Sequence, residues 1–206
     1  MVARPARRYV AFLRGVSPLN AKMPELKRAF ERAGFEDVET MLTSGNVLFS
    51  ARGGSERAIA QRAEAAMAQH LGRSFVTFIR SVDELRHLLQ TSPYAAHRPR
   101  PRPRSKRVVT FLHSSPKHPP SLPLELPGVR ILCIAGREVF SDYAAETRGP
   151  ALMQLLQKTF GKSNTTRTWQ TVEKAAADVK ATAKANGRPT VNARAKVKAK
   201  TKATAK

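Results

Sequence analysis

The sequence is poor in cysteine, in acidic residues and in long apolar segments. Its 206 residues include one cysteine, Cys133, so the chain can form neither an internal disulfide nor a cysteine-based zinc ribbon. Such cysteine usage is typical of a reducing compartment, and we therefore expect a cytoplasmic protein. No apolar run approaches the ~18 residues that a membrane helix requires, and the apolar stretch at 9–13 is too short for an export signal. We therefore expect no membrane partner.

The excess of basic over acidic residues is concentrated in two segments of the chain. The chain has 15 acidic residues against 37 Lys and Arg, a formal net charge of +22. Residues 180–206 hold nine of the basic residues and no acidic one, and residues 98–107 hold six more. The rest of the chain carries about +7, an ordinary balance for a folded protein. The sequence thus places the excess charge in extensions of a folded body.

Hydrophobic periodicity predicts six elements in the first part of the chain. Short apolar runs at 9–13, 38–42, 47–49 and 75–79 indicate strands, and 3.6-residue spacing indicates helices over 23–33 and 56–71. Ser55 can cap the second of these helices, and Gly34 and Gly72 suit the left-handed helix ends. Gly45-Asn46 suits a two-residue type II′ hairpin turn. The order strand, helix, strand, strand, helix, strand predicts a ferredoxin-like unit with an antiparallel sheet at residues 8–82.

A second, smaller α+β subdomain is predicted over residues 83–175. Residues 81–84 form a capping box that begins a helix, and alternating Arg and Pro at 98–104 predict an extended connector. Strands are expected at 108–112, 129–134 and 139–143, and helices at 150–160 and 165–179. The fold class is therefore α+β, with a ferredoxin-like βαββαβ first half and this second subdomain. Residues 176–206 are predicted to be a disordered basic tail, because their Ala-Lys-Thr composition cannot bury enough apolar surface to fold.

Three motifs in the chain resemble those of one protein family. They are Y-V-A-F-L-R-G-V at residues 9–16, T-S-G-N-V-L-F at 43–49 and T-T-R-T-W-Q-T at 165–171. In this order they resemble the uncharacterised domain-of-unknown-function 1697 family. The resemblance implies a compact bacterial α+β protein with a ferredoxin-like first half, and it implies no activity. Where the family often has I-N-V-G-G, residues 16–20 read V-S-P-L-N, which weakens the idea that this loop wraps a phosphate.

Five polar side chains near these motifs are candidates for binding a small anion: Arg14, Lys22, Ser44, Asn46 and Arg167. An arginine in a cleft can clamp a carboxylate or a phosphate, and equally it can form an ion pair or stack on Trp169. Ser44 beside Asn46 suggests a nucleophile with an oxyanion donor, but no residue has a spacing that identifies its base, and a tight turn explains the same residues. An enzyme or sensor for a small anion is therefore one hypothesis for the function, and no catalytic residue can be named.

No cofactor or metal is predicted. His113, His118 and Cys133 lack the paired spacing of zinc ligands. Residues 161–163 read G-K-S, but Leu156 stands where a phosphate-binding P-loop needs its first glycine.

The basic tail leads to the main functional hypothesis. An excess of cations with no acidic residue binds polyanions by releasing counterions, with little sequence preference. We therefore expect a non-catalytic binding module that contacts DNA or RNA through its tail; an inert, solubilising tail and a structural homodimer formed by sheet edges remain open. The tail residues expected to contact nucleic acid are Lys184, Arg188, Arg194, Lys196, Lys198, Lys200 and Lys202.

Overall fold

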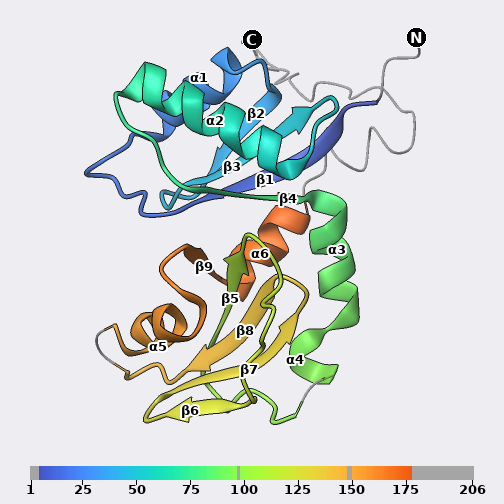
Figure 1. The fold of residues 1–206 in the computed structure, drawn as a ribbon, viewed down its shortest axis with the longest axis vertical. Coiled ribbons are helices and arrows are strands. Elements are labelled where there is room, and N and C mark those ends of the chain that lie inside the picture. The colour runs from blue at the N-terminus through green and yellow to red at the C-terminus, as the bar shows by residue number, and fades with distance from the viewer. Residues whose placement is uncertain (1–4, 97, 148–149, 178–206) are drawn as a thin grey trace, which may run out of the picture.

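The first strand, β1 (Arg7–Leu13), lies inside the first sheet because its apolar residues are buried on both faces. In the computed structural model, which describes residues 5–96, 98–147 and 150–177, this sheet has the strand order β2-β3-β1-β4 and every pair is antiparallel (Figure 1). The other strands are β2 (Glu36–Met41), β3 (Asn46–Ala51) and β4 (Thr77–Ser81). Helices α1 (Met23–Arg32) and α2 (Glu56–Leu71) cover one face. The predicted ferredoxin-like βαββαβ unit is thus confirmed.

The second half of the chain builds another antiparallel sheet, with the strand order β6-β7-β8-β5-β9. Its strands are β5 (Lys106–Leu112), β6 (Leu124–Leu126), β7 (Val129–Ala135), β8 (Glu138–Tyr143) and β9 (Asn164–Thr168). Helix α5 (Ala151–Phe160) packs on one face of this sheet. Helices α3 (Val82–Thr91), α4 (Pro93–Ala96) and α6 (Trp169–Ala176) pack on the opposite face. In Figure 1, α6 lies between the two sheets, and α3 runs from the first sheet down to α4 at the lower end of the second. The predicted α+β class is correct for both halves.

The two sheets share a hydrophobic core. Because side chains alternate along a strand, Tyr9, Ala11 and Leu13 of β1 face α1 and α2, whereas Val10 and Phe12 face the second sheet. The Phe12 ring stacks on Phe111 of β5 with their centroids 4.3 Å apart. Each fully buried side chain of this kind contributes roughly 1.5–3 kcal/mol to folding. The face of the first sheet that the helices leave open is therefore closed by the second sheet.

Helix ends follow the predicted signals. Ser55 caps α2, and residues 81–84 form the reciprocal capping box at the start of α3. Gly72 takes the left-handed conformation that ends α2, with φ of 65°. Local chemistry was sufficient here because a cap is satisfied by atoms a few residues away.

The predicted two-residue turn at Gly45-Asn46 is wrong. Met41 pairs with Asn46 across the hairpin, so the connection is the four-residue loop 42–45 and Asn46 is the first residue of β3. Gly45 has φ of +72°, and a Cβ at this position would lie 2.6 Å from the Cβ of Val16. The glycine is thus needed both for its conformation and for the close approach of the loop to residue 16.

The predicted helix over 165–179 is also incorrect in its first turn. Residues 164–168 form β9, which pairs with β5, and the helix begins only at Trp169, where the Thr168 side chain accepts a hydrogen bond from the backbone of Thr171. Three threonines favour the strand because β-branched side chains fit a pleated surface. Ala176, placed in the predicted tail, is a buried residue of α6. The rest of that tail, from residue 178 on, lies outside the described residues.

The Arg-Pro connector forms neither helix nor strand between residues 98 and 105, in agreement with its composition. It is nevertheless fastened to the second sheet. The backbone N–H of Arg102 donates to the Asp142 carboxylate at 2.8 Å, and Arg130 donates to the carbonyl of Arg100 at 3.1 Å. Arg102 also pairs with Glu125 at 3.4 Å, so this basic segment belongs to the folded body and part of its charge is compensated there. Among the described residues, no helix has the length and apolar character that crossing a membrane demands.

Candidate functional site at the junction of the two sheets

Arg167 crosses the junction between the two sheets. It belongs to β9 of the second sheet, yet its Nε donates to Asn46 Oδ1 of the first sheet at 2.6 Å. Its Nη2 donates to the carbonyl of Leu13 at 2.6 Å and to that of Ser44 at 3.0 Å, and its Nη1 donates to Thr165 and Thr166. The guanidinium therefore ties the end of β1 and the hairpin loop 42–45 to the second sheet.

These contacts use every N–H direction of the Arg167 guanidinium. The group has five N–H donors in a fixed plane, and described residues supply an acceptor for each of them. Burial lowers the pKa of Arg167 to about 10, which still leaves it charged at neutral pH. In this arrangement Arg167 acts as a positioning residue, and an incoming anion would have to displace protein acceptors.

Asn46 and Ser44 complete this network of hydrogen bonds. Asn46 is fully buried, and its Nδ2 donates to the carbonyl of Met41 and to Ser44 Oγ at 3.0 and 3.1 Å. The exposed Ser44 hydroxyl thus faces an amide donor, which cannot withdraw its proton. The geometry favours the tight-loop interpretation of Ser44 over the nucleophile.

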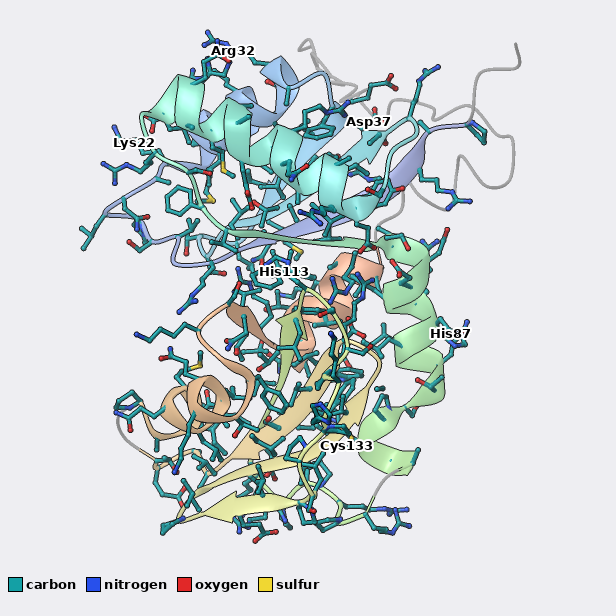
Figure 2. The ribbon with its side chains drawn as sticks, viewed as in Figure 1. Lys22, Arg32, Asp37, His87, His113 and Cys133 are labelled. Atoms are coloured by element: carbon teal, nitrogen blue, oxygen red, sulfur yellow. The ribbon has the colours of Figure 1, made fainter. Side chains whose placement is uncertain are left out.

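The remaining two predicted anion ligands lie apart from this network. Arg14 is half-buried and follows β1 directly, where its backbone N–H donates to the carbonyl of Val76 at 2.9 Å. Lys22 is exposed at the N-cap of α1 and lies at the outer end of the first subdomain, away from the junction (Figure 2). The structure therefore brings together Ser44, Asn46 and Arg167. Arg14 directly follows Leu13, whose carbonyl accepts from Arg167, and Lys22 lies outside this network.

A second cluster at the junction was missed by the sequence interpretation. Arg137, in the turn between β7 and β8, binds Glu56 at the start of α2 through its Nη1 and Glu84 in the first turn of α3 at 3.1 Å. The adjacent Arg80 of β4 pairs with Glu138 and donates to the carbonyl of Leu112 at 2.7 Å. These ion pairs connect the first half of the chain to the second through residues that are far apart in sequence.

Two hollows open on either side of this cluster. One, of about 820 Å³, lies between α3 and the β7–β8 turn, and the other, of about 700 Å³, lies beside the first turns of α2. Arg80 and Arg137 line both of them. His113, which lines the second, stacks on Phe78 with ring centroids 4.1 Å apart and lies at the level where the two sheets meet (Figure 2). Among the described residues, no three His, Cys, Asp or Glu side chains are grouped as ligands of a metal ion.

The pKa values of the two carboxyl groups that bind Arg137 are shifted in opposite directions. Burial raises the pKa of Glu56 above its ordinary value, although the hydrogen bond from Arg137 opposes this. Burial also acts to raise the pKa of Glu84, but its hydrogen bonds from the backbone and side chain of Ser81 outweigh burial and lower the pKa overall. Glu84 is therefore the firmly ionised partner of Arg137.

This difference predicts unequal effects of two matched substitutions. Because the pKa of Glu56 is raised in the folded protein, its contribution to stability is present at low pH and is lost as the pH rises through that pKa. Because the pKa of Glu84 is lowered, its contribution is present above pH 4.5 and is lost as the pH falls through the lowered pKa. At pH 7 we expect Glu84→Gln to lower the free energy of unfolding by about 0.5–1 kcal/mol and Glu56→Gln to lower it less. Urea unfolding at pH 7 and pH 4 measures both, and the deficit of Glu84→Gln should shrink at pH 4. A larger loss for Glu56→Gln at pH 7 would contradict this assignment.

The comparisons with known proteins agree with this arrangement of strands and helices. A family model described as "Protein of unknown function (DUF1697)" matches residues 6–131, more than half of the chain. The chain belongs to the DUF1697 family. The match ends at residue 131, so Arg167 and the third motif lie beyond it. No curated protein matches the chain.

A solved structure supports the fold of this DUF1697 protein. The conserved bacterial protein SP0830 from Streptococcus pneumoniae is similar, with a TM-score of 0.61 and 20% sequence identity. The similarity covers 84% of this chain and 97% of the other. At this identity the likeness concerns the fold alone, and the function must be argued from this chain's own residues.

Proposed function

We propose that this DUF1697 protein is a cytoplasmic, non-catalytic binding module that attaches to nucleic acid through the basic segment following α6. The observation that carries the proposal is the separation of charge along the chain. Residues 180–206 contain nine Lys and Arg and no Asp or Glu. Such a segment gains affinity for a phosphate backbone by counterion release and reads little or no sequence.

The folded body supports this division of roles. Its acidic side chains at the junction are engaged by its own arginines, so they do not compete for the basic segment. The point where the segment leaves the body is fixed, because Arg86 Nε of α3 donates to the carbonyl of Ala176 at 3.0 Å. The last turn of α6 thus lies beside α3, and the basic segment follows it in the chain.

Neutralising the tail tests the proposal in the full chain. Replacing Lys196, Lys198 and Lys200 by Gln is expected to weaken binding to a short fluorescent DNA duplex about tenfold at low salt, because each lost phosphate contact removes released counterions. The matched control replaces Arg28, Arg73 and Lys117, three exposed cations of the body, by Gln and should change the affinity much less. Equal losses for the two triple variants would show that only net charge matters and would reject the assigned role of the tail.

The small-anion alternative draws less support. Arg167, its strongest candidate ligand, has its N–H groups engaged by described protein atoms, which leaves Arg14 and Lys22 as the cations available. Lys22 lies outside the junction (Figure 2). An anion sensor built on these residues would need a rearrangement of the 42–45 loop.

The structural homodimer is likewise less favoured by the edges of the first sheet. Edge strand β2 carries Glu36 and Glu39 and an irregular register between them. At the other edge, the backbone N–H of Thr77 in β4 donates to Glu64 within the same chain. Charges, bulges and occupied backbone groups are the devices by which proteins prevent edge-to-edge pairing.

A further inference from the structure

A third hollow lies on the outer face of the second sheet, away from the junction. It measures about 470 Å³ and opens between the first turn of α5 and strands β5, β8 and β9. This volume falls within the range of small-ligand sites. Neither the nucleic-acid proposal nor the junction uses it.

The sheet register explains how the hollow forms. Side chains at alternate positions of β5 share one face, and Lys106, Val108 and Thr110 stand opposite Tyr143, Thr168 and Thr166, respectively. Helix α5 covers the part of this face that includes Leu112, Val139 and Ile131. The end of the face near Lys106 is left uncovered by α5, and the hollow occupies that end.

The lining divides into an apolar floor and a cationic, hydroxyl-rich rim. Val108 and Val129 of the sheet and Leu152 and Met153 of α5 supply the apolar part. Val129 is fully buried and Val108 nearly so, so the floor is part of the packed core and is preformed. The rim also includes Tyr143 and three threonines, Thr147, Thr166 and Thr168, whose hydroxyls bond within the protein.

Lys106 sets the charge of the hollow. Its ammonium lies 5.9 Å from the centre of the Tyr143 ring, which holds it at the rim. The other cation of the lining, Arg167, turns its guanidinium to the opposite face of β9, where it binds Asn46. The described residues that line the hollow include no Asp or Glu. The bordering first turn of α5 adds the positive end of a helix dipole.

We propose that this hollow binds a small carboxylate with an apolar body. The carboxylate would lie at the rim beside the Lys106 ammonium and the Tyr143 hydroxyl, and its hydrocarbon part would contact Leu152, Met153 and the exposed edge of Val108. A cation is disfavoured because Lys106 is charged and the described lining residues include no Asp or Glu. A purely polar anion would leave the apolar floor unfilled.

The probe 2-naphthoate tests this proposal with the full chain. Titration followed by ¹H–¹⁵N NMR should show saturable shifts confined to β5, β8, β9 and the first turn of α5. Two comparison compounds separate the contributions: 2-naphthalenemethanol keeps the rings without the charge, and inorganic phosphate keeps a charge without the rings. Both should bind about tenfold more weakly or worse, since a charge-assisted contact and an apolar floor each contribute at least that factor.

Two substitutions assign the binding to the hollow. Lys106→Met removes the ammonium at an exposed position and should weaken 2-naphthoate about tenfold without altering the weak binding of the alcohol. Met153→Trp should fill the cavity and abolish binding of both. Lys158→Met, at the far end of α5, is the matched control and should leave the affinity unchanged.

Three results would overturn the proposal. These are no binding of 2-naphthoate up to about 10 mM, equal affinity for the acid and the alcohol, or retained affinity in the Lys106→Met and Met153→Trp variants. Because 2-naphthoate is not a polyanion and the hollow lies apart from residues 178–206 in the chain, these results are independent of the nucleic-acid proposal.

Discussion

Arg167→Met is expected to lower the free energy of unfolding by about 3–5 kcal/mol, because the charged guanidinium donates to several acceptors and each hydrogen bond to a charged group contributes about 1.5–3 kcal/mol. The substitution keeps an unbranched apolar side chain as long as the aliphatic part of arginine, but it leaves Asn46 Oδ1 and the carbonyl of Leu13 without the donor they have at 2.6 Å. Unpaired buried acceptors each cost about 1–3 kcal/mol. Urea unfolding followed by the fluorescence of Trp169, the single tryptophan, measures the loss.

Two further variants make this prediction specific. Arg73→Met removes an exposed arginine from the loop before β4 and should stay within about 0.5 kcal/mol of the unmodified protein. Combining Arg167→Met with Asn46→Ala in a double-mutant cycle should give losses well short of additive, because both changes remove the same hydrogen bond. If Arg167→Met cost less than about 1 kcal/mol, Arg167 would not hold the two sheets together and its role would have to be sought elsewhere.

Asp142→Asn is the second substitution with a large expected effect, again about 3–5 kcal/mol at pH 7. Asp142 is 1% exposed and accepts hydrogen bonds from Arg130 at 2.9 and 2.7 Å, from the Arg102 backbone at 2.8 Å and from Ser105 at 2.9 Å. The amide would present N–H groups to these donors, and the buried Arg130 would lose its counter-charge at 2.7 Å and keep the more distant Glu125 at 3.7 Å. The same change would release the Arg-Pro connector from the sheet.

The pH dependence of this variant gives an independent check. Burial acts to raise the pKa of Asp142, but its hydrogen bonds with Arg130, Arg102 and Ser105 outweigh burial and lower the pKa below 3.8. This contribution to stability is therefore full above pH 3.8 and is lost as the pH falls through the lowered pKa. The difference between the unmodified protein and Asp142→Asn should shrink in that acidic range. Asp83→Asn, at a side chain that is 85% exposed, should show neither effect, and an equal loss there would contradict the argument.

The elements that the sequence predicted well are those defined by their own residues. The apolar run of β1 and the capping residues Ser55, Ser81 and Gly72 act within a few positions, so local patterns are enough to place them. The order of these elements then restricts the first sheet to the ferredoxin-like arrangement.

The errors occur where a distant contact decides the structure. The spacing of Trp169, Val172 and Ala176 extends a helical pattern backward over the threonines at 165–168, but the open edge of β5 captures that segment as β9. The four-residue hairpin loop depends on its approach to Val16, which no local pattern encodes.

The candidate site was also predictable only where local sequence motifs mark its residues. Ser44 and Asn46 share one motif, and Arg167 belongs to another, so the resemblance to one family drew attention to all three. Their meeting across 121 positions of sequence could not be derived. Arg137 and its partners Glu56 and Glu84 belong to no motif, and only the capping role of Glu84 was visible in the sequence.

The central claim is that the segment after α6 carries the affinity for nucleic acid and the folded body does not. Its most direct measurement is the salt dependence of binding to a DNA duplex for the full chain and for a chain ending at residue 177. For the full chain the logarithm of the affinity should fall linearly with the logarithm of salt concentration, with a slope of up to about −8 if all nine charges neutralise phosphates. The shortened chain keeps 28 Lys and Arg against 14 acidic residues, so it should still show some salt dependence, but it should bind more weakly and with a much shallower slope. The same affinity and slope for both chains would contradict the claim.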